Sequence, residues 1–204
     1  MRWRLILIAR SHCACAFSPL AHAVLAFPLI LVSLRQTLTS LTIMTTPLWA
    51  LAAGCVPDAA PWDIPRIAAA AGFRSSGMWV DPKTTWGSDA LAKTQQALTE
   101  TGIALVDVEV AWLEKNNRAT DIQKLIVDVG LALGARNLLV VSRHEDYNAS
   151  IDQFRDVCER AGDGLRVCLE FGEFTQIKSL QAANAFIDAV DHPAAGILID
   201  LMHI

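Results

Sequence analysis

The chain has 204 residues, of which 53% are hydrophobic, and a formal net charge of −4 at pH 7. This length can bury a sizeable core, and the acidic balance argues against a general nucleic-acid binder, which needs a basic face to neutralise phosphates. The five cysteines show no C-x-x-C spacing, so the sequence indicates neither a zinc knuckle nor a thioredoxin-type site. We expect Cys158 and Cys168 to be small buried hydrophobes.

Residues 1–44 differ in composition from the rest, because they contain no Asp, Glu or Lys. They have three interpretations: an upstream mis-start with translation beginning at Met44, a secretory signal with a cleavage pattern at Ala21–Ala23, or a membrane anchor between Arg10 and Arg35. We therefore divide the chain into this apolar extension and a body at 45–204. The acidic body is expected to be soluble and cytoplasmic, with no membrane contact of its own.

The body alternates between short apolar runs and longer amphipathic segments. Strands are expected at 48–54, 73–80, 103–110, 137–142, 165–171 and 196–201, and helices at 66–71, 89–101, 121–133, 150–161 and 179–190. A glycine follows each of the first four helices, where a left-handed C-cap is expected. Such alternation predicts a parallel sheet covered by helices.

Two α/β architectures fit this alternation, a doubly wound open sheet and a (β/α)8 barrel. The turn after the first strand, Gly54–Asp58, lacks the G-x-G-x-x-G pattern of dinucleotide-binding sheets. The alternation of side chains along the later strands places four acidic residues on one side of the sheet: Asp107, Glu109, Glu170 and Asp200. It also places Val106, Val108 and Val110 together on the opposite side. We therefore predict an incomplete barrel of the (β/α)8 TIM type, with about six strands and five helices.

The strongest chemical signal lies at the ends of the last two predicted strands. The fifth strand ends in Glu170, and the sixth delivers Asp200 and then His203. The carboxyl ends of neighbouring barrel strands meet at one rim. Carboxylates there can hold Mg²⁺ or Mn²⁺ or act as general bases, and an imidazole shifts the metal preference towards Mn²⁺, Co²⁺ or Zn²⁺. The structural alternatives are an ion pair of Glu170 with Lys178 and an N-cap role for Asp200.

Further candidates for substrate contacts lie on the same rim. They are Glu109, Trp112 and His144, with Trp79 as a second aromatic wall on which a sugar could stack. Each has a structural alternative: Glu109 as a partner of Arg136 or Arg143, the tryptophans as core residues, and His144 as part of a polar loop.

At this point the sequence resembles the xylose isomerase-like TIM barrels. The matching runs are Cys168–Phe171, Gly196–His203 and, near the start of the body, Ile67–Phe73 leading into Gly77–Trp79. The resemblance covers 47–204. It implies that Glu170 and Asp200 are metal ligands, that Glu170 is also the acid–base, and that His203 contacts substrate. The implied activity is isomerase or epimerase chemistry of carbohydrate metabolism, with a metal-assisted proton transfer on a small hydroxy-carbonyl sugar or sugar phosphate.

The resemblance also implies a departure, because the family takes a second histidine from the seventh strand and a second glutamate from the eighth. The chain is therefore expected to be a truncated barrel, which in one interpretation is inactive by itself, with open sheet edges that favour self-association. A dehydratase or lyase acting on a cyclic polyol through the same metal site remains an alternative. So does a non-catalytic remnant that binds a sugar or a partner chain. The endonuclease branch of the family ranks below these, since the body is acidic.

Overall fold

The computed structural model describes residues 6–8 and 48–204. The strands are β1 (Ile6–Ile8), β2 (Ala50–Leu51), β3 (Ser75–Trp79), β4 (Ala104–Leu113), β5 (Asn137–Ser142), β6 (Arg166–Glu170) and β7 (Ala195–Asp200). The helices are α1 (Ile64–Ala70), α2 (Ala90–Thr101), α3 (Asp121–Leu133), α4 (Tyr147–Ala161) and α5 (Leu180–Val190). Two 3-10 turns, η1 (Ala53–Cys55) and η2 (Leu201–His203), follow β2 and β7.

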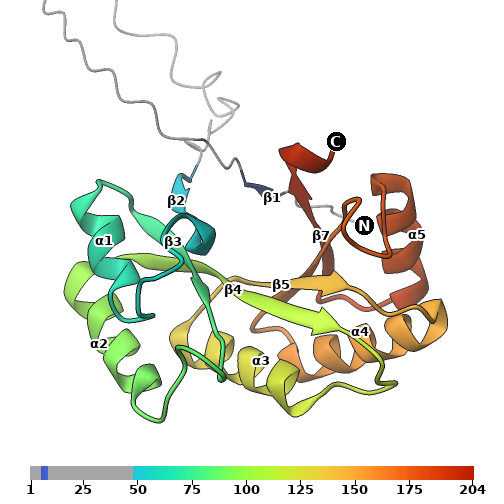
Figure 1. The fold of residues 1–204 in the computed structure, drawn as a ribbon, viewed down its shortest axis with the longest axis horizontal. Coiled ribbons are helices and arrows are strands. Elements are labelled where there is room, and N and C mark those ends of the chain that lie inside the picture. The colour runs from blue at the N-terminus through green and yellow to red at the C-terminus, as the bar shows by residue number, and fades with distance from the viewer. Residues whose placement is uncertain (1–5, 9–47) are drawn as a thin grey trace, which may run out of the picture. The chain divides into compact units, whose positions relative to one another are not determined.

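The strands form one parallel sheet in the order β1-β7-β6-β5-β4-β3-β2. The helices cover the outer side of this curved sheet, as Figure 1 shows. The strands of the body follow one another in chain order, each joined to the next by a helix, which is the arrangement of an incomplete (β/α)8 barrel. This confirms the predicted fold class. Strand β1, which the sequence pattern did not predict, pairs with β7.

No helix among the described residues is long and apolar enough to cross a membrane. Apart from β1, the extension at 1–44 lies outside the described residues. The structure therefore does not test its interpretation as a secretory signal, a membrane anchor or an upstream mis-start.

The two sides of the sheet bury different sets of side chains. The helix side holds the main core, to which β6 contributes Val167 and Leu169. The inner side holds a small apolar cluster: Leu139, Val141, Cys168 and Leu198. Both cysteines expected to be buried, Cys158 and Cys168, are buried and reduced. Burial raises the pKa of the Cys158 thiol, and it raises that of Cys168 to about 12, so neither thiol is a nucleophile or metal ligand near neutral pH.

Local sequence signals set the helix ends. Thr120 caps α3, because its hydroxyl accepts from the Gln123 amide while the Gln123 side chain accepts from the Thr120 amide. Helix α4 begins at Tyr147, three residues before the predicted start, because the Asp146 carboxylate caps the amides of Asn148 and Ala149. Gly134 ends α3 in the left-handed conformation, at φ 70°.

Strand β4 departs from the predicted alternation. It runs on to Leu113, and its pairing with β5 shifts register between Val108 and Ala111. Val108 therefore packs on the helix side, whereas Val110 packs against the inner cluster. The prediction that both valines share one face was wrong, because a register irregularity breaks the two-residue period of a regular strand. The same shift turns Trp112 to the inner side.

The loop between β4 and α3 is fastened to α4 by two side chains, Gln153 and Asp156. The Gln153 side chain is fully buried; its Oε1 accepts from the Glu114 amide at 3.1 Å, and its Nε2 donates to the Arg118 carbonyl at 3.1 Å. Asp156, one turn further along α4, accepts from the Ala119 amide at 3.0 Å. Helix α4 thus holds both ends of the loop that follows β4.

We expect Gln153→Leu to lower the free energy of unfolding of the full chain by about 1–3 kcal/mol, because two backbone groups lose their partner while the volume stays similar. Urea denaturation measures the change. Gln95→Leu, at an exposed position of α2, is the matched control and should stay within about 0.5 kcal/mol of the unsubstituted chain. Equal stabilities of the two variants would contradict the role of Gln153 as the anchor of this loop.

Candidate functional site

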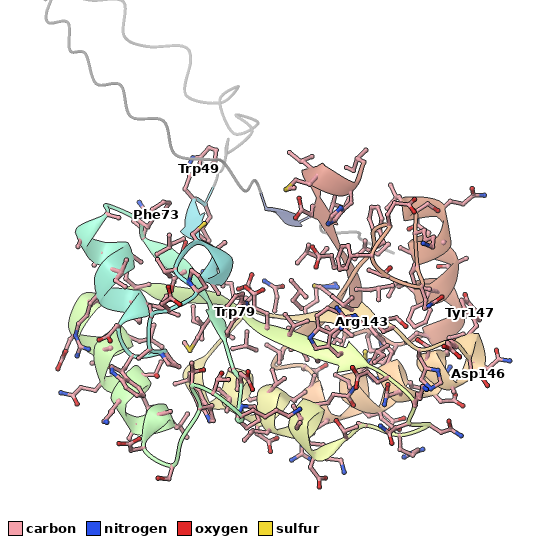
Figure 2. The ribbon with its side chains drawn as sticks, viewed as in Figure 1. Trp49, Phe73, Trp79, Arg143, Asp146 and Tyr147 are labelled. Carbon is pink, nitrogen blue, oxygen red and sulfur yellow. The ribbon has the colours of Figure 1, made fainter. Side chains whose placement is uncertain are left out.

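A cavity of about 810 Å³ opens at the carboxyl ends of the strands. Residues from β3, β4, β6 and β7, and from the segments that follow them, line its wall. A cavity of this size suits a small ligand, and the carboxyl ends of the strands are where (β/α)8 barrels place their sites. Figure 2 shows Trp79, one of its lining residues, over the inner side of the sheet.

Three predicted site residues come together on this wall. Glu170 at the end of β6, Asp200 at the end of β7 and His203 in η2 each offer one ligand atom, and these atoms lie within 4.8 Å of one another. Glu170 and Asp200 are buried, at 6% and 4% exposure, and His203 is half-buried. Two carboxylates and an imidazole at this spacing are groups that can hold a divalent metal ion.

Backbone pairing places the two carboxylates. Glu170 lies opposite Leu198 in the parallel ladder, and Asp200 follows two residues later, so both side chains point to the inner side. Asp200 also accepts a hydrogen bond from the Met202 amide at 2.9 Å and thereby caps η2. The N-cap role weighed for Asp200 is therefore present, and it closes the turn that returns His203 to the carboxylates.

The loop after β6 holds the His203 ring from the other side. The rings of Phe174 and His203 lie 5.0 Å apart, centroid to centroid. A Cβ added to Gly172 would lie 3.0 Å from Cγ of His203 and 2.8 Å from the Phe174 ring, so only glycine leaves room for this ring pair. The Lys178 ammonium donates to the carbonyl of Glu173 at 3.0 Å, within the loop after β6.

The other predicted contacts divide into two groups. Glu109 and Trp112 line the cavity. His144 does not line it: the residue is buried in the loop after β5, and its Nδ1 accepts from the Asp146 amide at 3.0 Å.

The Arg143 guanidinium lies 3.7 Å from the centre of the Trp112 ring, as a cation–π contact. Arg143 is labelled beside the ends of β4 and β5 in Figure 2.

Sequence reasoning missed several lining residues, because they lie in loops where no periodicity applies. They include Asp81 after β3, Glu114 after β4 and Phe174 after β6. A usable signal existed for each, since all three lie within four residues of a strand's carboxyl end, where barrel sites are built.

The chain matches the family described as Xylose isomerase-like TIM barrel over residues 65–204. No curated protein matches the sequence.

Solved structures with a similar fold include two sugar epimerases and a dehydratase. The D-allulose 3-epimerase of Methylomonas sp. is 19% identical, with a TM-score of 0.53 over 66% of this chain and 55% of that one. The D-psicose 3-epimerase of Clostridium cellulolyticum H10, solved with D-tagatose, is 15% identical, with a TM-score of 0.57 over 72% and 61%. The probable 3-DHS dehydratase of Bacillus anthracis is 16% identical, with a TM-score of 0.59 over 76% and 63%.

These similarities, all below 20% identity, establish a shared fold. The chain spans 55% to 63% of the length of these three structures.

We expect Gly172→Ala to displace the His203 ring. The φ of Gly172 lies outside the left-handed region, so the added methyl acts through its collision with His203 and Phe174. The imidazole resonances of His203 should therefore move in nitrogen-15 spectra of the variant. In Gly87→Ala, the control, the nearest atom to the new Cβ is 3.9 Å away. Unmoved His203 resonances in Gly172→Ala would contradict the prediction.

Proposed function

The chain belongs to the xylose isomerase-like TIM barrel family, and from this premise we propose that its cavity holds a divalent metal ion and carries out isomerase or epimerase chemistry. The reaction is a proton transfer at the carbon next to the carbonyl of a small sugar or sugar phosphate. The observation that carries the proposal is the convergence of Glu170, Asp200 and His203 within 4.8 Å in a cavity at the barrel rim.

The donor set fits a divalent metal. Two carboxylate oxygens and an imidazole nitrogen are ligands shared by Mn²⁺, Co²⁺ and Zn²⁺, and the carboxylates suit Mg²⁺ as well. Both carboxylates are buried, and a divalent cation bound between them would offset their mutual repulsion. When bound, the metal would polarise the substrate carbonyl and lower the cost of its developing negative charge.

The chain's own residues supply the remaining roles. Glu170 removes the proton from the carbon next to the carbonyl, because a carboxylate within reach of a carbon acid is a competent general base. In the isomerase reaction it delivers this proton to the former carbonyl carbon, while the hydroxyl proton moves to the former carbonyl oxygen. His203 contacts a hydroxyl or carbonyl oxygen of the substrate. Glu109 and Trp112, which β4 contributes to the wall, orient the sugar, the first by hydrogen bonds and the second by stacking.

We expect Mn²⁺ to bind the full chain and Asp200→Asn to weaken this binding at least about a hundredfold, which is the upper end of the loss caused by removing an outer-shell partner of a metal ligand. Asparagine keeps the oxygen that caps η2 but lacks the negative charge. Titration calorimetry measures the affinity, and Asp163→Asn, at an exposed position, is the control. Unchanged binding in Asp200→Asn would exclude Asp200 as a ligand.

We expect the full chain with Mn²⁺ to incorporate deuterium from D₂O into a ketose, next to the carbonyl. D-tagatose, D-allulose and D-fructose are the probes, and proton NMR is the readout. Glu170→Gln should slow this exchange at least about a hundredfold, because general-base catalysis contributes that much or more. The control, Glu173→Gln, changes the exposed carboxylate paired with Lys178.

Exchange in Glu170→Gln at the unsubstituted rate, with Mn²⁺ bound, would show that Glu170 is not the base. Loss of water from a cyclic polyol without ketose exchange would favour the dehydratase alternative. Sugar binding without any chemistry would favour a non-catalytic remnant.

A further inference from the structure

We infer that the cavity selects an uncharged polyhydroxy substrate and discriminates against its phosphate ester. This inference rests on the proposed function, and it narrows the substrate class of the same site. Volume alone does not decide the question, because a cavity of about 810 Å³ accommodates a hexose or its phosphate. The charges on the cavity wall decide between the two substrates.

The wall offers little that recognises a phosphate. Among the described residues that line the cavity there is no arginine, and Lys83 is the one lysine. Phosphate sites favour the bidentate fork of arginine or several converging donors. Lys83 is an exposed residue of the loop after β3, and a single exposed ammonium contributes little binding energy. Arg143 contacts the Trp112 ring but is not itself a lining residue.

The helix that begins at the cavity already has two of its first four backbone amides engaged. The first turn of α3 contributes Thr120, Ile122 and Gln123 to the wall, and a helix N-terminus is a common phosphate site because its amides lack partners. In this helix the capping box already uses the Gln123 amide and the Thr120 amide. Asp121 adds a negative charge to the same turn, which opposes a phosphate there.

Carboxylates outside the metal cluster repel an anion further. Asp81 follows β3 and Glu114 follows β4, and both line the cavity. Asp81 is held in place, since its carboxylate accepts from the Lys83 amide and the Thr84 hydroxyl, each at 2.9 Å. The Glu114 backbone is held by Gln153. Two carboxylates on the wall, that of Asp81 held by hydrogen bonds and that of Glu114 exposed, make the approach of a dianion unfavourable.

The same wall suits a neutral sugar. Trp79 is 37% exposed and lines the cavity, so its ring offers an apolar face to the C–H groups of a sugar. Carboxylates accept hydrogen bonds from hydroxyl groups, which a polyol supplies in number. The residues that discriminate against a phosphate are therefore also those that recognise a polyol.

The test compares D-fructose with D-fructose 6-phosphate by calorimetry on the full chain, with the Mn²⁺ concentration buffered. We expect the phosphate ester to bind at least about tenfold more weakly at roughly 0.02 M salt, and the difference to shrink at roughly 0.3 M salt, because mobile ions screen exposed charges. Glu114→Gln should reduce the ratio of the two affinities, fructose to fructose 6-phosphate, by about threefold, as expected for removing one charge near the ligand. Glu145→Gln, at an exposed position outside the cavity, is the control and should leave the difference unchanged.

Each result bears on one claim. Equal or tighter binding of the phosphate ester overturns the inference and leaves the proposed function standing. If Arg143→Met then removes this binding, the stacked arginine is the anion site. If fructose binds more tightly than its phosphate ester, and neither the salt concentration nor Glu114→Gln changes this difference in affinity, then repulsion by the wall carboxylates is not the cause of the selectivity. Binding of neither ligand overturns the proposed function, and the inference falls with it.

Discussion

Glu170 pairs with Leu198 in the parallel ladder between β6 and β7. Asp200 lies two residues after Leu198 and therefore points to the same side of the sheet. Every other property of the site depends on this register, because a shift of one residue would turn the carboxylate into the helix-side core. Helices α4 and α5 pack over these strands from the outer side, as Figure 1 shows. The capped turn after β7 then returns His203 to the pair, so one ladder and one turn supply all three donor atoms.

The inner side of the sheet combines few apolar residues with several acidic ones. Its apolar cluster is small: Leu139, Val141, Cys168 and Leu198. Burying a carboxylate lowers stability unless it is hydrogen-bonded or paired, and Asp200 accepts a hydrogen bond from the Met202 amide. The large apolar core lies on the other, helix-covered side of the sheet.

The loops that follow the strands set the character of the cavity. Gln153 fastens the loop after β4, and Asp81 fixes its own loop through local hydrogen bonds. Gly172 leaves room for the His203 ring. These contacts order the Asp81 carboxylate, the Glu114 backbone and the His203 ring before any ligand arrives, which reduces the ordering cost of binding. The scaffold that carries them is shared with epimerases and a dehydratase, of which this chain spans little more than half.

The sequence by itself determined the order of strands and helices, the parallel sheet and the side to which Glu170 and Asp200 point. These features follow from periodicities of two and 3.6 residues and from caps such as Thr120, which act over a few positions. Only the tertiary structure decided that β4 shifts register and turns Val110 inward, that His144 lies off the cavity, and that Phe174 and Glu114 line it. Each of these depends on contacts between segments far apart in the chain, and a local pattern carries no record of such contacts.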